Sequence, residues 1–301
     1  MGNELFNNKS IIDWLSYYVE KTNVDLERVK ILDITKKNKN LIPTIEGNEC
    51  VMVFTEAGHP DIFFKMWEVG LGECDVWYNI GSEPEGDVKH DKVKNMINRG
   101  IDASAAMLII NSRARNTYKI GMNNTSFSRG SVQYVGSEIR AVIMNKMHVS
   151  YGDNICVISG ESIAVESAII SGEGHIIAVE YSRKDRETLE DNMEKFGINN
   201  IAVVDHVDME TFKDLAVPSL TMLVASASME QEIECLLKLN PSMEFVIYTL
   251  DFKCAAMIPD MLKGYGFKDV EAIQITVSKL NGNVFDTEPS PWIITASGKE
   301  D

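Results

Sequence analysis

The chain lacks the cysteine and histidine patterns of a metal site or a disulfide framework. No two cysteines form a C-x-x-C pair, and the five histidines are scattered, with no H-E-x-x-H spacing. The five cysteines are Cys50, Cys74, Cys156, Cys235 and Cys254. An odd number of isolated cysteines is typical of free buried thiols in a reducing compartment. We therefore expect a cytoplasmic protein with no metal site and no disulfide.

Long apolar runs and a surplus of basic residues are also missing. No apolar stretch has the length of a membrane span, and the N-terminus has no basic region followed by an apolar segment, as a secretion signal would. The chain has 29 Lys and Arg against 45 Asp and Glu, a net charge of −16. Phosphate backbones and anionic lipids attract basic surfaces, so we expect neither nucleic acid nor a membrane as partner. A local basic pocket for an anionic small molecule stays compatible with this charge.

Residues 1–115 show apolar patterns of both helices and strands, which predicts a small α/β domain. The predicted helices are Ile11–Lys21, Pro60–Val69 and His90–Arg99, and the predicted strands are Cys50–Thr55, Asp75–Asn79 and Ala106–Asn111. The stretch Ser112–Val135 is polar and rich in Asn, Ser and Gly. We interpret residues 116–136 as a linker or an ordered arm between domains.

Residues 137–301 alternate between helices and strands in a regular way, which predicts a mostly parallel sheet covered on both faces. The predicted helices are Ser137–Met147, Ser162–Ile170, Lys184–Phe196, Met229–Leu239 and Cys254–Tyr265. The predicted strands are Ile155–Ile158, His175–Glu180, Ile201–Val204, Leu220–Val224, Glu244–Tyr248, Val270–Val277 and Trp292–Ala296, with a loop at Ser278–Pro291. Because two strands follow each other at the end, we expect the last one to run antiparallel.

Several short stretches of this region resemble one family in the right order. They are Glu138–Val142 with Lys146, Gly152-Asp153, Gly174–Glu180, Asn192 with Phe196-Gly197, Asn200-Ile201 and Pro291–Thr295. Over residues 118–298 the chain resembles the decarboxylating precorrin-6Y (cobalt-precorrin) methyltransferases of cobalamin biosynthesis. Residues 45–111 resemble the C-terminal half of a tetrapyrrole methylase, whose Gly-rich N-terminal half is missing here.

This resemblance implies a class I S-adenosylmethionine-dependent methyltransferase domain of Rossmann-like fold. It also implies a homo-oligomer that methylates and decarboxylates a precorrin-type tetrapyrrole. Such folds bind the cofactor at a Gly-rich turn after strand one, an acidic residue ending strand two and a loop after strand three. Glu180 matches the second place, and we expect it to face an open cleft. Asp208 or His206 matches the third place, although an Asp in a polar loop is also a common turn former.

The first of these places, the turn after strand one, departs from the family pattern. The turn reads Ser159-Gly160-Glu161, with a single glycine, and Val157 replaces the acidic residue of the preceding strand. Ala225 begins a loop that also lacks the family's glycines. Fewer glycines mean less room for a ligand near the backbone. The alternative is therefore a non-catalytic relative with a binding or scaffolding role, in which Ile158 or Ile163 fills the methionine pocket.

A precorrin-type acceptor carries many carboxylates, so its cleft should offer basic and aromatic side chains. The candidates are Arg129, Arg140 and Lys146, with Lys279, Phe127 and Tyr134. For Arg140, the alternative is an ion pair with Glu138 or another acid on a solvated helix face.

Overall fold

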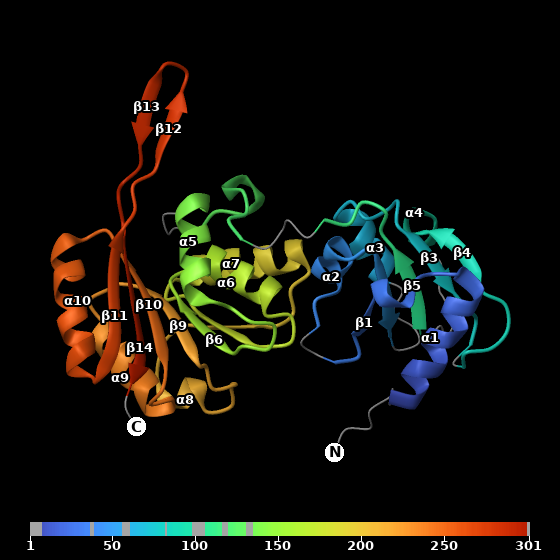
Figure 1. The fold of residues 1–301 in the computed structure, drawn as a ribbon, viewed down its shortest axis with the longest axis horizontal. Coiled ribbons are helices and arrows are strands. Elements are labelled where there is room, and N and C mark those ends of the chain that lie inside the picture. Colours follow the sequence, from blue (N-terminus) through green and yellow to red (C-terminus); the bar gives the residue numbers. More distant parts are fainter. Residues whose placement is uncertain are drawn as a thin grey trace. The chain divides into compact units, whose positions relative to one another are not determined.

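The structure, a computed structural model, describes residues 8–36, 39–55, 61–81, 83–97, 106–115, 120–130 and 135–299. The chain forms two compact units. The first unit comprises Met1–Tyr118 with Lys195–Asn199, and the second comprises Lys119–Glu194 with Asn200–Asp301. Figure 1 follows the chain through its elements.

A five-stranded sheet of order β1-β2-β5-β3-β4 forms the centre of the first unit. Its strands are β1 (Val29–Asp33), β2 (Cys50–Phe54), β3 (Asp75–Tyr78), β4 (Lys89–Lys92) and β5 (Ala106–Ile110). Its helices are α1 (Asn8–Thr22), η1 (Leu26–Arg28), α2 (Leu41–Gly47), α3 (Asp61–Glu68) and α4 (Val93–Met96). Helix α1 places Trp14 and Tyr18 on one face, against Met52 and Phe54. The opposite face packs against residues of α2, α3 and α4. The sheet is thus covered on both sides.

The sequence prediction for His90–Arg99 is wrong at its start. These residues begin within β4, and among the described residues 90–97 only Val93–Met96 is helical. The sequence of β4, KHDK, has no apolar period, and the strand forms because it pairs with β3. His90 stacks on Trp77 with ring centroids 4.2 Å apart, and its Nε2 lies 3.0 Å from Asp75 Oδ1. Strand β1 and helix α2 were not predicted. The local sequence pattern is weak in β1, α2 and β4, so tertiary contacts decide their secondary structure.

A seven-stranded sheet of order β11-β14-β10-β9-β6-β7-β8 forms the second unit. The strands are β6 (Ile155–Ile158), β7 (Ile176–Val179), β8 (Ile201–Val204), β9 (Leu220–Val224), β10 (Glu244–Thr249), β11 (Phe267–Gln274) and β14 (Trp292–Lys299). The helices are α5 (Ser137–Met147), α6 (Glu161–Ile170), α7 (Arg183–Phe196), α8 (Met209–Phe212), α9 (Met229–Leu239) and α10 (Phe252–Gly264), and η2 (Asn124–Ser126) precedes them. Only β14 runs against its neighbours. The expected Rossmann-like α/β architecture is confirmed.

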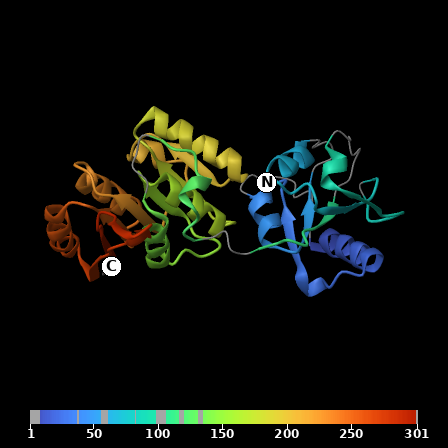
Figure 2. The ribbon, with the colours of Figure 1, turned by 90° about the horizontal axis from the view of Figure 1, so that it is seen from above.

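The layers follow from the apolar strands. All four residues of β6 and of β7 are buried, as expected for parallel strands covered on both faces. Helices α8, α9 and α10 contribute to the core on one face, and α5, α6 and α7 lie on the other (Figures 1 and 2). Since parallel strands point the same way, the turns after β6, β7, β8, β9 and β10 meet at one edge of the sheet. Ligands of such sheets bind at this edge.

The predicted loop Ser278–Pro291 instead contains a two-stranded hairpin, β12 (Ser278–Asn281) and β13 (Val284–Thr287). It projects from the sheet between β11 and β14 (Figure 1). All eight strand residues are exposed. The apolar side chains Leu280, Val284 and Phe285 are 63%, 69% and 71% exposed. Across the described part of the chain, every helix is too short or too polar for a membrane span.

Candidate functional site

In the turn after β6, Ser159 adopts a backbone conformation that is typical of glycine. Ser159 has a φ of 56°, in the left-handed region that glycine adopts most readily. Its N–H donates to the carbonyl of Val179 at 2.9 Å, and Gly160 is the N-cap residue of α6. Tertiary pairing with β7 therefore holds the tight turn that this fold needs.

Apolar side chains pack closely around this turn. A Cβ added to Gly160 would lie 2.8 Å from Val157 Cγ1 and 3.4 Å from Met222 Sδ. Ile158 is 1% exposed and Ile163 is fully buried. Such close packing is what we would expect of a non-catalytic relative, in which apolar side chains take the place of the ligand. Gly160 is required for this close approach, because any side chain there would collide with β6.

Glu180 lies at the carboxyl end of β7, as predicted, but it is buried. Its side chain is 2% exposed, so the expected open cleft is not found around it. Burial, followed by the negative charges of Glu161 and Asp185, raises the pKa of its carboxyl group to about 8, although the hydrogen bond from the backbone N–H of Gly160 lowers it. A carboxyl group in this environment holds its proton at neutral pH.

Part of the predicted linker lies next to the carboxylates of Glu161 and Asp185, and we call residues 120–130 the cover segment. A Cβ added to Gly130 would lie 2.6 Å from Asp185 Oδ1 and 3.0 Å from Glu161 Oε2. Asn192 of α7 holds the segment, since its Oδ1 accepts from the N–H of Ser128 at 2.7 Å and its Nδ2 donates to the Ser128 carbonyl at 3.2 Å. The segment is thus an ordered part of the site.

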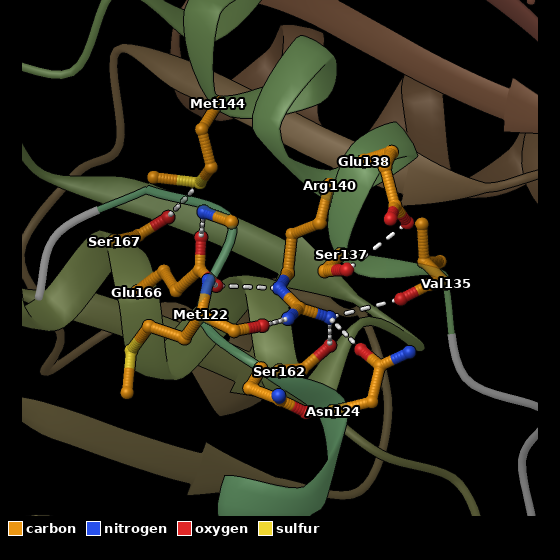
Figure 3. Close-up of polar contacts among 12 residues, drawn as sticks. Met122, Asn124, Val135, Ser137, Glu138, Arg140, Met144, Ser162, Glu166 and Ser167 are labelled. Atoms are coloured by element: carbon orange, nitrogen blue, oxygen red, sulfur yellow. Dashed lines mark hydrogen bonds and ion pairs between the residues drawn. The ribbon is translucent and has the colours of Figure 1, made fainter. Parts of the chain in front are cut away.

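Arg140 of α5 holds the cover segment in place through buried contacts (Figure 3). Both Arg140 and Glu166 are fully buried, and Arg140 Nε donates to Glu166 Oε1 at 2.5 Å. Its Nη1 donates to the carbonyl of Val135 at 2.9 Å, and its Nη2 donates to the carbonyl of Met122. The guanidinium carbon also lies 4.8 Å from the centroid of the Phe127 ring, within the range of a cation–π contact.

Glu166 completes this arrangement. Its carboxylate accepts from the N–H groups of Gly121 at 2.9 Å and Met122 at 2.8 Å, in addition to Arg140. Side chains of Asn124 and Ser162 also accept from Arg140 Nη1. All three guanidinium nitrogens therefore donate inside the protein. This position fits an internal structural role better than the substrate contact that the sequence suggested.

A cavity of about 590 Å³ lies at the same edge of the sheet. The cover segment contributes Asn124, Arg129 and Gly130, and α5 with its N-cap contributes Ile139 and Gly136. The strand ends and the base of the hairpin contribute Val224, Tyr248, Leu250, Glu288, Pro289 and Pro291. Among the substrate candidates, exposed Arg129 lines this cavity. Ser159, Gly160 and Glu180 are not in its lining.

Sequence reasoning missed Tyr248, Leu250 and Glu288 as members of this lining. Tyr248 and Leu250 stand at and just after the end of β10, and the rule that ligands bind at the carboxyl ends of parallel strands could have found them. Glu288 lies between β13 and β14, and only the hairpin brings it to the cavity. No local signal in the sequence marks it.

The remaining candidates do not line this cavity, although Lys279 and Ala225 contact residues that do. Lys146 pairs with Glu271 of β11, and Lys279 pairs with Glu138 at 3.1 Å and Glu288 at 2.9 Å. Asp208 is the N-cap of α8, where its carboxylate accepts from the N–H of Thr211 at 2.7 Å.

His206 contacts Asp208 at 2.8 Å, between Nε2 and Oδ2. The N–H of Ala225 donates to the carbonyl of Tyr248 at 2.8 Å. Tyr134 lies outside the described residues. Within the described ranges, no cluster of His, Cys, Asp and Glu could hold a metal ion.

The fold and the arrangement of this edge define a class I methyltransferase architecture. One solved structure of this kind is the precorrin-6Y C5,15-methyltransferase of Geobacter metallireducens, at 24% identity and a TM-score of 0.54, over 59% of this chain and 96% of that one. Another is a precorrin-8W decarboxylase from Methanobacterium thermoautotrophicum, at 13% identity and a TM-score of 0.51, over 59% of this chain and all of that one.

The sequence model of the precorrin methyltransferase domain matches residues 126–293, more than half of the 301 residues. The chain therefore belongs to the precorrin methyltransferase domain family, and the resemblance found over residues 118–298 is confirmed. No curated protein matches the chain.

Proposed function

We propose that this protein is an S-adenosylmethionine-dependent C-methyltransferase that acts on a precorrin-type tetrapyrrole in cobalamin biosynthesis and also decarboxylates it. The observation that carries the proposal is the place of Glu180. It ends the second strand of a precorrin methyltransferase fold, next to the turn at Ser159 and Gly160. A carboxylate at this point can accept hydrogen bonds from two ribose hydroxyls.

The residue types fit the cofactor, but the cofactor can reach them only if the end of the cover segment moves. Glu180 would hold the ribose, and Ser159, Gly160 and Glu161 would border the methionine part. Asp208 and Ala225 would flank the adenine. The cofactor would supply an electrophilic methyl group on its sulfonium. Since Gly130 lies against Glu161 and Asp185, the end of the cover segment has to shift for a ligand to reach Glu180.

The cavity beside the turn supports an acceptor site. Its volume of about 590 Å³ lies within the usual range of ligand pockets. Arg129 offers a guanidinium that can bind a carboxylate in a bidentate manner. Tyr248 and Leu250 offer an apolar wall for part of a macrocycle. The protein's role toward the acceptor would be to orient it and to exclude water.

A second candidate is a binding or scaffolding protein without methyl transfer. The burial of Glu180, which is 2% exposed, and the single glycine of the turn favour it. In that case the cover segment stays closed, and the carboxyl group of Glu180 is part of the interior. Cofactor binding separates the two candidates.

Calorimetric titration with S-adenosylhomocysteine tests the proposal. We expect the wild type to bind, and Glu180→Ala to weaken binding by about ten- to hundredfold, because hydrogen bonds to a charged acceptor are worth about 1.5–3 kcal/mol. This value applies to the ionised form of Glu180, which the carboxyl group regains when the ligand enters and its burial is relieved. Glu187→Ala is the control, since this glutamate lies on α7 and pairs with Arg183 on the surface. A wild type that takes up no ligand would instead support the binding protein.

We also propose that the protein is a homo-oligomer and that the β12–β13 hairpin is the contact element. The cover segment packs against α6 and α7 of its own unit, through Glu166 and Asn192. Isolated two-stranded hairpins are marginally stable, and their free edges pair readily with other strands. A second copy would cover Leu280, Val284 and Phe285, which are more than 60% exposed.

Light scattering tests this assembly. We expect the wild type to have the mass of an oligomer, and Leu280→Ser with Phe285→Ser to shift it toward the monomer, since burial of each apolar side chain is worth about 1.5–3 kcal/mol. Ile12→Ser, at a site 60% exposed in the first unit, is the control. A wild type that stays monomeric at high micromolar concentration would refute the proposal.

A further inference from the structure

The turn that follows β5 in the first unit is fixed onto the end of α2. Asn111 Nδ2 donates to the carbonyl of Ile45 at 2.9 Å, and Asn111 Oδ1 accepts from the N–H of Arg113 at 3.0 Å. The N–H of Arg115 donates to the carbonyl of Glu46 at 2.9 Å. The backbone of this turn is therefore held in place, and it carries two arginines at a defined point beside Glu46.

These residues surround a cavity of about 280 Å³. Glu46, Arg113 and Arg115 line it together with the apolar Val69 and Leu71. Glu73 lines it too, but its carboxylate lies 3.2 Å from Lys92 Nζ and 2.6 Å from Lys94 Nζ. The charge of Glu73 is thus balanced by lysines of its own unit.

The charges of Glu46, Arg113 and Arg115 are not neutralised by partners in this way. Within the described part of the chain, neither guanidinium nor the Glu46 carboxyl group makes a hydrogen bond or an ion pair. Burial is the sole cause that raises the pKa of Glu46 to about 7. A half-buried acid without a partner is costly. Opposite charges that line one cavity without meeting each other mark a place for a ligand that carries both.

We propose that this cavity binds a small zwitterion, an α-amino acid with an apolar side chain. Its carboxylate would pair with Arg113 and Arg115, and its ammonium group with Glu46. Val69 and Leu71 would contact the side chain. The site belongs to the first unit and is independent of the methyltransferase function.

The binding should depend on pH through Glu46. The other titratable groups of the lining are Glu73, which is paired with lysines, and Cys74, whose pKa burial raises to about 11. Neither changes charge near neutrality. Because the ammonium group needs the ionised form of Glu46, affinity should rise about tenfold from about pH 6 to about pH 8.

Calorimetry on the full chain with three matched probes tests the inference. L-Leucine carries both charges, 4-methylpentanoate lacks the ammonium group, and 3-methylbutylamine lacks the carboxylate. We expect L-leucine to bind at least about tenfold more tightly than either single-charge probe. Equal affinities of the three probes, or no binding of L-leucine up to about 10 mM, would overturn the inference.

Variants show which residues bind the ammonium group and which bind the carboxylate of the ligand. Glu46→Gln should lower the affinity for L-leucine about tenfold and remove its pH dependence, with no loss for 4-methylpentanoate. Arg113→Gln with Arg115→Gln should lower affinity for both carboxylate probes. Arg28→Gln, which removes a surface pair with Glu49 in the same unit, is the control. Thermal melting confirms that each variant is folded, and unchanged affinity in folded Glu46→Gln would contradict the assignment.

Discussion

Replacing Arg140 with methionine should lower the free energy of unfolding of the second unit by about 3–5 kcal/mol, because removing one partner leaves a buried charge uncompensated. Glu166 is fully buried, so its carboxylate cannot gain water as a new partner. The carbonyls of Met122 and Val135 lose their donors as well. This combined loss makes Arg140 the residue on which the order of the cover segment depends most.

Amide hydrogen exchange followed by mass spectrometry measures this effect within the second unit. Peptides of the cover segment and of α5 should exchange about a hundredfold faster or more in the variant, since about 1.4 kcal/mol corresponds to a factor of ten. Glu138→Gln is the control, as Glu138 lies on the surface of the same helix and pairs with Lys279. A change of less than about 1 kcal/mol would show that the ion pair is hydrated.

Replacing Arg140 and Glu166 together separates the ion pair from its surroundings. A double change to methionine removes both charges and should recover part of the lost stability, as apolar residues of similar volume often replace buried pairs without loss. Recovery should be incomplete, because the N–H groups of Gly121 and Met122 lose their acceptor. Full recovery would mean that these two hydrogen bonds contribute little.

Glu180→Gln should stabilise the protein at alkaline pH and leave it unchanged at acid pH. The pKa of Glu180 is raised from 4.5 to about 8, so between these values the folded state keeps a proton that the unfolded chain has lost. Stability of the wild type therefore falls as pH rises through this window, at about 1.4 kcal/mol per pH unit at most. Glutamine carries no such proton and avoids the loss.

Urea unfolding of both proteins at about pH 5 and about pH 8.5 measures the difference, which should grow by a few kcal/mol between the two conditions. Glu187→Gln is the matched control, because Glu187 is exposed on the neighbouring helix. A difference that stays constant with pH would show that the Glu180 carboxylate is already ionised in the folded protein. The cover would then be open in solution.

The sequence predicted the second unit well because its signals are local and strong. The continuous apolar runs of β6, β8 and β9 and the amphipathic pattern of α5 give the bounds that the structure shows. The order of these elements also implied a sheet with one reversed strand. In the first unit, β4 has no apolar period, and its sequence KHDK pairs with β3, where Trp77 lies opposite His90.

For the site, the sequence alone determined the place of Glu180 at the end of β7, since strand and turn are encoded within a few residues. It left two roles for Arg140, and the structure supplies a buried acid, Glu166, which stands 26 residues away. The position of the cover segment was decided only by tertiary structure. It depends on Ser128 reaching Asn192, 64 residues further on, and no local pattern can encode a contact between segments so far apart. The burial and raised pKa of Glu180 are likewise properties of what surrounds the residue, which includes the charges of Glu161 and Asp185.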